Sequence, residues 1–187
     1  MRRHVVTFFI IFSSFSLHAA DTETILYRPF GSAQQQDPIV IKQQLTGDCS
    51  GQSLRIKRED AWRCSAAGKI YDPCFIKQYG SLKQAVCPQS PWVGESIEIN
   101  LPAAVDNSQH ATLDMSRTYP WAVELSDGEH CQAVDDGNML EGLPVHYQCA
   151  NQSVLVGHLQ RCKREWSMLQ HNPDGQIETI VVNKAWF

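Results

Sequence analysis

The chain has 187 residues and a formal net charge of −4, with an apolar fraction of 43% and a charged fraction of 19%. This balance is typical of a globular protein with room for a real core. It excludes a disordered chain, a collagen-like repeat and a coiled coil. The mild acidity argues against nucleic acid as the main partner. Seven cysteines in a chain of this size point to an oxidising compartment.

The first twenty residues have the pattern of a secretory signal peptide. Arg2 and Arg3 give a positive start, an apolar run covers residues 5–12, and two alanines close the segment. A membrane anchor is the alternative, but the run is short for a bilayer-spanning helix. Removal of the segment leaves 14 basic and 20 acidic residues, a charge of −6. No later segment reaches about 20 apolar residues. The sequence therefore predicts an exported chain, secreted or periplasmic, that does not insert into a membrane.

Residues 21–46 are predicted to form an N-terminal arm that enters a strand near residues 39–41, and residues 47–187 a disulfide-stapled β domain. Short apolar runs alternate with turn signals along this domain. Further strands are expected near residues 54–57, 96–101, 121–125, 145–149, 154–156, 166–169 and 177–183. Prolines break any long helix, so the only candidate helix is 75–86. The predicted fold is mainly β: a single compact domain of short antiparallel strands, sandwich- or barrel-like, with at most one short helix.

The cysteines set the expected framework. They are Cys49, Cys64, Cys74, Cys87, Cys131, Cys149 and Cys162. An odd count leaves one unpaired, and sequence alone does not decide the connectivity. Chain proximity favours the pairs Cys49–Cys64, Cys74–Cys87 and Cys131–Cys149. Each bridge would close a loop of roughly 15 residues, worth about 3 kcal/mol in the chain-entropy model. Cys162 would then be unpaired and free to join two chains in a dimer.

Two other roles for these cysteines are open. His146 with Cys149, and His158 with Cys162, have spacings that suit paired zinc ligands. However, the two pairs lie close together, and an exported chain normally oxidises its cysteines. Alternatively, Cys162 is a nucleophile whose thiolate the flanking basic residues would favour. No protease signature surrounds it, so we expect a structural cysteine, no metal and no cofactor.

Candidate catalytic groups are scattered. His110 with Asp114, and Asp127 with His130, combine a histidine with a carboxylate, as acid–base catalysis requires. None of the four lies in a local motif specific for hydrolysis. Basic residues cluster at 55–58 and again at 161–164. In an acidic chain, both clusters are expected to lie on strand faces and to pair with carboxylates.

One part of the sequence resembles a family. Residues 60–64 (Asp-Ala-Trp-Arg-Cys) and 70–75 (Ile-Tyr-Asp-Pro-Cys-Phe) resemble the signature of an uncharacterised family of small secreted bacterial proteins. The similarity continues with Pro-Trp-Ala-Val-Glu-Leu-Ser-Asp-Gly at 120–128. The resemblance implies a secreted single domain with six framework cysteines, and it leaves Cys162 outside that framework. It implies no catalytic residue and no substrate. Ala67 departs from the pattern, which has asparagine there.

Clear fold signals without a convergent catalytic signature favour a non-enzymatic binding module of the cell envelope or the extracellular space. Its ligand would be a protein or a glycan, and an inhibitor of a hydrolase belongs to this class. The alternative is a small secreted hydrolase that uses histidine and carboxylate side chains. That alternative requires His110, Asp114, Asp127 and His130 to converge in one cleft.

Overall fold

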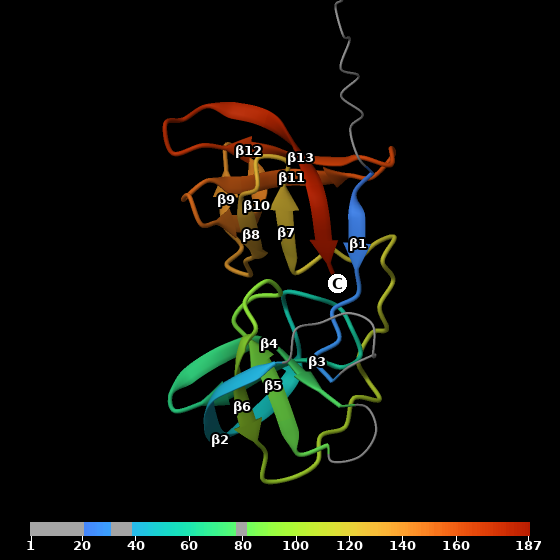
Figure 1. Ribbon diagram of the computed structural model, residues 1–187, viewed down its shortest axis with the longest axis vertical. Coiled ribbons are helices and arrows are strands. Elements are labelled where there is room, and N and C mark those ends of the chain that lie inside the picture. Colours follow the sequence, from blue (N-terminus) through green and yellow to red (C-terminus); the bar gives the residue numbers. More distant parts are fainter. Residues whose placement is uncertain (1–20, 31–38, 78–81) are drawn as a thin grey trace, which may run out of the picture.

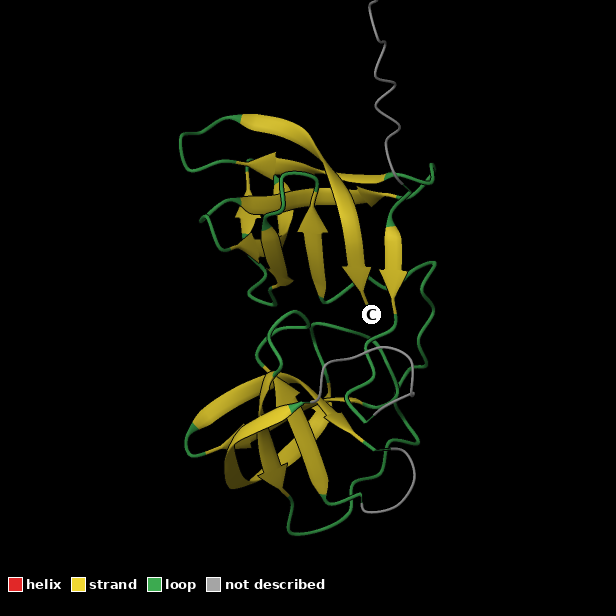
Figure 2. Cartoon of the chain, in the orientation of Figure 1, coloured by secondary structure: helices red, strands yellow, loops and turns green. Residues whose placement is uncertain are grey.

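A computed structural model describes residues 21–30, 39–77 and 82–187, and the predicted signal peptide lies outside this part of the chain. The described residues form strands, turns and loops without an α-helix (Figure 2). None of them belongs to a helix long and apolar enough to cross a membrane. The mainly β, disulfide-stapled fold predicted from the sequence is therefore confirmed.

The first half of the chain forms a closed barrel, the lower half of Figure 1. Strands that follow one another in the sequence lie side by side in this barrel and run antiparallel. The first and last strands pair in parallel, because five strands in an up-and-down order leave both ends running the same way. The strands are β2 (Val40–Gln52), β3 (Ala61–Ala66), β4 (Lys69–Ile76), β5 (Gln84–Pro88) and β6 (Glu95–Asn100).

The second half forms a ring of six antiparallel strands, closed by the pairing of its last strand with its first. The ring contains β7 (Ala122–Leu125), β8 (His130–Ala133), β10 (Leu143–Cys149), β11 (Val154–Gln160), β12 (Trp166–His171) and β13 (Ile177–Trp186). Two short strands are added at its margin. These are β9 (Met139–Leu140), paired with β10, and β1 (Glu23–Ile25), which runs parallel to β13.

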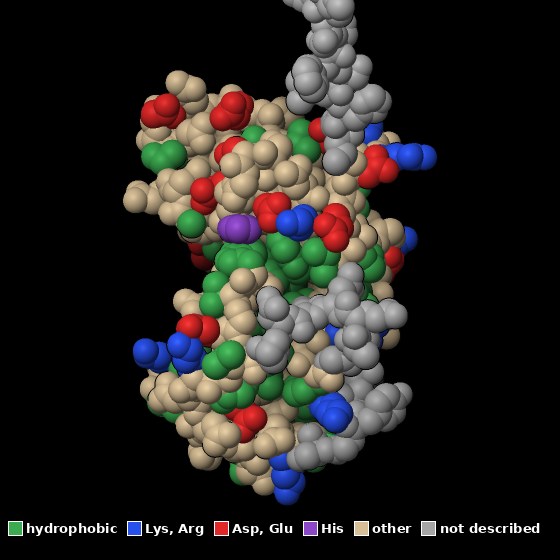
Figure 3. Space-filling view, viewed as in Figure 1, with side chains coloured by type: hydrophobic (Ala, Val, Ile, Leu, Met, Phe, Trp, Pro, Cys, Tyr) green, Lys and Arg blue, Asp and Glu red, His purple; other side chains and the backbone are tan. Residues whose placement is uncertain are grey.

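One hydrophobic cluster joins the two barrels into a compact unit. Phe75 and Ile56 of the first half lie in the same cluster as Trp121 and Phe187 of the second. Tyr27, which follows β1, packs between them, with its ring 5.3 Å from both Phe75 and Trp121. Figure 3 shows hydrophobic side chains gathered at the waist of the molecule, where the barrels meet. The packing of aromatic rings at this junction fixes how one barrel sits on the other.

Three disulfides join Cys49 to Cys64, Cys74 to Cys87 and Cys131 to Cys149, the pairs that chain proximity favours. Two of these bridges span directly paired residues of adjacent strands. The first two lie in the core of the first barrel, in one cluster with Trp62. Phe75, the next residue after Cys74, packs into the junction cluster.

Two local expectations are wrong. The described residues of the range 75–86 form no helix, because Phe75 and Ile76 end β4 and pair with β5. Residues 78–81 of that range lie outside the described part. The range 54–57 is no strand but part of the loop between β2 and β3. Within the range 21–46, expected as an arm, the structure contains β1 and the first half of β2.

Candidate functional site

The loop between β2 and β3, residues 53–60, lies between the two barrels. The Ser53 hydroxyl is fully buried and accepts hydrogen bonds from the backbone N–H groups of Arg55 and Ile56, each at 3.1 Å. These bonds curl the backbone into a turn, which is why the alternating sequence does not form a strand. Ser53 also donates a short hydrogen bond to Asp72, and burial raises the pKa of that carboxyl.

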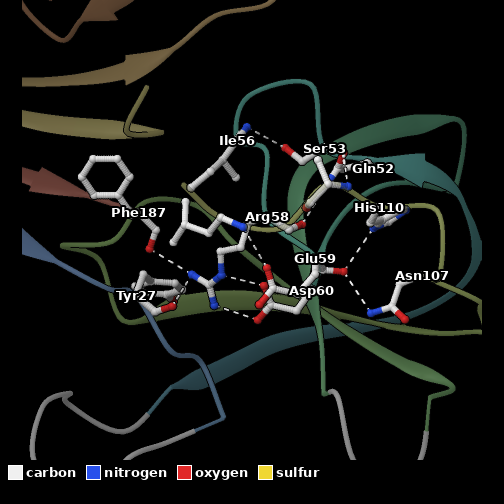
Figure 4. Close-up of polar contacts among 12 residues, drawn as sticks. Tyr27, Gln52, Ser53, Ile56, Arg58, Glu59, Asp60, Asn107, His110 and Phe187 are labelled. Atoms are coloured by element: carbon white, nitrogen blue, oxygen red, sulfur yellow. Dashed lines mark hydrogen bonds and ion pairs between the residues drawn. The ribbon is translucent and has the colours of Figure 1, made fainter. Parts of the chain in front are cut away.

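Arg58 anchors this loop from the inside. Only 5% of the residue is exposed, and one guanidinium nitrogen donates hydrogen bonds to the backbone oxygens of Tyr27 at 2.5 Å and Phe187 at 2.9 Å. The other two nitrogens face the Asp60 carboxylate at 2.6 and 2.7 Å (Figure 4). The guanidinium carbon lies 4.8 Å from the centre of the Phe75 ring. Because its fork engages three separate segments, Arg58 ties both halves of the chain to the loop.

The linker that connects the barrels, residues 101–121, docks on the other side of the loop. The backbone oxygen of Glu59 contacts Asn107 Nδ2 and His110 Nδ1, each at 3.1 Å (Figure 4). Gln52 exchanges two hydrogen bonds with the backbone of Ala111. The His110 ring lies 4.1 Å from the ring of Trp62. The role of His110 in this structure is therefore to hold the linker on the first barrel.

Arg161 fixes the later part of the linker to the second barrel. Its guanidinium donates hydrogen bonds to the backbone oxygens of Met115 at 2.7 Å and Thr118 at 2.6 Å. It also lies over the rings of Tyr119 and Trp166, at 5.5 and 4.9 Å from their centres. These contacts hold Tyr119 in place, with its other neighbour, the His146 ring, stacked at 4.4 Å. The sequence interpretation of Arg161 as a strand-face residue paired with a carboxylate is wrong.

The loop, the linker and β10 enclose a cavity of about 260 Å³ between the barrels, here called the seam cleft. Ile56 and Arg58 are buried in the protein. Their neighbours Arg55, which is half-buried, and Lys57, which is exposed, lie on the cleft side. The cleft has a basic rim and an apolar, aromatic floor. The principal lining residues are Arg55, Lys57, Arg117, Tyr119, His146 and Tyr147.

The electrostatics of the seam cleft are one-sided. Arg55, Lys57 and Arg117 contribute three cations, and no aspartate or glutamate among the described residues lines the wall. Arg117 also forms an ion pair with Asp114 at 3.7 Å. Because this pair is exposed to water, Asp114 competes only weakly with a bound anion for Arg117. The floor residue Tyr147 is fully buried, donates a hydrogen bond to the backbone oxygen of Pro120 at 2.8 Å, and has a pKa raised by burial. The cleft is thus suited to an anion.

His146 adds a titratable group to the cleft wall. Burial, and secondarily the nearby His158, lower the pKa of His146 below its ordinary value. The unfolded chain therefore takes up this proton first as the pH falls. Stability contributed by neutral His146 is lost from its unfolded pKa of about 6.5 down to its lower folded pKa.

We expect the His146→Gln variant to lose less unfolding free energy than the wild type between pH 7 and pH 5. Urea unfolding at a series of pH values measures this difference. His171→Gln serves as the matched control, because it removes a histidine from the far end of β12. Identical pH slopes for the wild type and His146→Gln would contradict this assignment.

The four candidate catalytic residues do not form a set. His110 binds the β2–β3 loop, and Asp114 accepts hydrogen bonds from Ser116, which lower the pKa of Asp114. Asp127 caps the β7–β8 turn by accepting the Glu129 N–H. His130 lies 3.4 Å from Glu124 and stacks on Trp92. Among the described residues no hydrogen bond, ion pair or ring contact joins any two of these four.

The alternative of zinc ligands at His146 with Cys149 loses a ligand, because Cys149 is bonded to Cys131. Within residues 21–30, 39–77 and 82–187, no three His, Cys, Asp or Glu side chains gather as a metal site would need. Cys162 is exposed and unpaired. A dimer through Cys162 stays a prediction.

The sequence patterns did not reveal the seam cleft. In the sequence, Arg55 and Lys57 stand out as members of a basic cluster and not as a binding site, and no motif contains Arg117 or Tyr119. Of the basic cluster at 55–58, Arg58 is the member that pairs with a carboxylate of the described residues. No protein-family model, no curated protein and no solved structure matches the chain. The assignment of the cleft therefore rests on its own residues.

Proposed function

We propose that the protein is an exported, non-enzymatic binding module that holds an anionic group of a glycan or a protein in the seam cleft. The observation that carries the proposal is the convergence of three cations, Arg55, Lys57 and Arg117, on a cleft whose wall has no carboxylate from the part of the chain that the structure describes. The whole chain has a net charge of −4, so this positive field is local. An anion held against apolar walls interacts more strongly with each cation than it would in open water.

The scaffold supports a binding role. Loops carry the basic side chains, while buried contacts such as those of Ser53 and Arg58 fix the backbone beneath them. Loops placed in this way by rigid sheets are common binding surfaces, because less conformational entropy is lost on binding. Three disulfides indicate an oxidising compartment, which supports export to the periplasm or the extracellular space. For the hydrolase alternative, no hydrogen bond, ion pair or ring contact among the described residues joins its histidines to its carboxylates.

The test is to neutralise the cleft. We expect the Arg55→Gln/Lys57→Gln variant to bind an anionic probe about tenfold more weakly than the wild type, a loss of about 1.4 kcal/mol. Two probes of matched charge, an oligogalacturonate and a polyglutamate peptide, distinguish a glycan ligand from a protein ligand. Isothermal titration calorimetry at about 0.15 M salt measures both, because exposed charges are partly screened there.

Lys163→Gln/Arg164→Gln is the matched control. Both residues are exposed, and their replacement removes the same net charge outside the cleft. The control should bind both probes as the wild type does. Equal losses of probe affinity in the two double variants would show that the probes are attracted by the overall charge of the protein and not by the cleft. Failure of both probes to bind the wild type would overturn the proposal.

A further inference from the structure

The first barrel is open along part of one strand. β4 pairs with β3 from Lys69 to Phe75, but its pairing with β5 is limited to Phe75 and Ile76. The disulfide between Cys74 and Cys87 follows immediately, with Cα atoms 4.0 Å apart. Beyond this bridge, residues 69–73 of β4 have no second strand beside them in the described structure. The outer edge of β4 is therefore free at this end of the barrel.

The turn of the β3–β4 hairpin determines which backbone groups face outward. Ala67 and Gly68 have φ angles of 49° and 74°, which is the pattern of a two-residue type I′ turn. The flanking residues Ala66 and Lys69 are then a hydrogen-bonded pair, and the next pair, Ser65 with Ile70, is not. The N–H and C=O groups of Ile70 accordingly point away from β3, toward the free edge.

Two cavities accompany this edge. One of about 350 Å³ and another of about 530 Å³ share Tyr71, Cys87 and Pro88 in their walls. They lie where β4 and β5 separate, so the gap between the strands is a real space. Pro88 ends β5 on the opposite wall and has no backbone N–H to offer. Ile70 leaves 60% of its surface exposed, which is unusual for a large apolar residue on an unprotected strand edge. In Figure 1 the hairpin turn projects from the lower barrel.

The charges around the edge favour an acidic occupant. The neighbouring carboxylates are already engaged: Asp72 by Ser53 and Leu54, Asp135 by Arg63 and Glu95 by Lys42. Lys69, on the edge strand itself, forms no ion pair with any described residue, and Arg55 lies in the wall of the smaller cavity without a salt bridge to a described residue. These two cations are available to a partner.

We propose that the free edge of β4 binds an extended, acidic peptide segment of a partner protein as an added β-strand. Outward N–H and C=O groups in strand geometry are complementary to the backbone of another extended chain. The two cavities would receive alternate side chains of that segment, since successive side chains of a strand point to opposite faces. Lys69 and Arg55 would face its carboxylates. Arg55 lines both this site and the seam cleft, but the strand pairing at β4 uses backbone groups that lie outside the cleft.

The test uses a proline at the edge. Because the Ile70 N–H takes no part in the ladder with β3, Ile70→Pro removes the outward donor and leaves the hairpin bonds intact. Peptides of about ten residues are selected from a random display library on the wild type, with counter-selection on Ile70→Pro. We expect the selected sequences to alternate β-branched and acidic residues. A synthetic copy should bind Ile70→Pro about tenfold more weakly than the wild type. It should bind Ile70→Thr, which keeps the N–H, within about threefold.

A second measurement needs no protein variant. The selected peptide is remade with N-methyl groups on alternate amides that would face β4, and this form should lose binding to the wild type. Failure to select any peptide that distinguishes the wild type from Ile70→Pro would overturn the proposal, as would equal binding of the N-methylated peptide. Sedimentation of the wild type as a dimer and of Ile70→Pro as a monomer would overturn it as well, because a second copy of the chain would then occupy the edge.

Discussion

Substitution of Arg58 by alanine should lower the free energy of unfolding by about 3–5 kcal/mol. The side chain of Arg58 is 6% exposed and that of its partner Asp60 is 14% exposed, so the substitution leaves a carboxylate with little access to water. It also removes the donor that satisfies the backbone oxygens of Tyr27 and Phe187. The Phe187 oxygen keeps the Tyr27 N–H as a donor at 2.7 Å, so the main costs are the buried Asp60 carboxylate without its partner and the lost guanidinium bonds.

Denaturation with urea under non-reducing conditions measures this loss. Arg164→Ala is the matched control, because Arg164 also forms an ion pair, with Asp21, but its side chain is 87% exposed. We expect that control to stay within about 0.5 kcal/mol of the wild type. Arg58→Lys should fall between the two, since an ammonium keeps the charge but not the planar fork. A loss below about 1 kcal/mol for Arg58→Ala would show that the guanidinium is not a main anchor of the loop.

The same substitution links stability to the proposed function. Arg58 holds the inner side of the loop whose outer side carries Arg55 and Lys57. In the fraction of the Arg58→Ala variant that stays folded, the backbone that carries Arg55 and Lys57 is no longer held in place. Binding of anionic probes should then weaken even though no cleft residue has been changed.

Trp121→Ala should destabilise the protein by about 3–5 kcal/mol. Trp121 is 1% exposed and lies at the junction, with its ring 5.3 Å from Tyr27 and 6.0 Å from Phe75. Truncation would leave a cavity among groups from both barrels and from the segment after β1. The neighbouring backbone is held by β-ladder hydrogen bonds and cannot easily collapse into that space.

Trp121→Phe provides the control, and its expected effect is much smaller. The indole nitrogen Nε1 is buried without a hydrogen-bond partner among the described residues, so phenylalanine removes an unsatisfied donor along with one ring. We expect a loss of less than half that of Trp121→Ala. Equal losses for the two variants, measured by urea unfolding, would show that the indole nitrogen has a partner or that the ring size is critical.

Short-range patterns in the sequence predicted strand positions and disulfide pairs correctly where successive strands also pair with each other. The alternation of Ile97 and Ile99 predicted a strand at 96–101, and β6 covers Glu95–Asn100. The disulfides match chain proximity because each barrel is a meander, in which consecutive strands are also spatial neighbours. Cysteines that are close in the sequence then lie on strands that pair with each other.

Local signals failed where partners distant in sequence determine the conformation. The alternation at 54–57 suggests a strand with Leu54 and Ile56 on one face, but Leu54 is exposed and Ile56 is buried, because the Ser53 hydroxyl holds the backbone in a turn. Phe75 and Ile76 are compatible with a helix by periodicity, yet their pairing with β5 makes them a strand. The parallel pairing of Glu23 with Lys184 joins the two ends of the described chain, and no local pattern encodes it.

The sequence by itself determined the β class of this protein, the oxidising compartment indicated by its cysteines and the position of several strands. These features depend on composition and on spacings of a few residues, which a single chain displays directly. Only the tertiary structure decided the division into two barrels, the dispersal of the four candidate catalytic residues and the seam cleft. The cleft assembles Arg55, Arg117 and His146 from a loop, a linker and a strand. They lie close together because the core at the junction packs the two barrels against each other. A contact between residues distant in the sequence produces no periodic pattern from which it could be predicted.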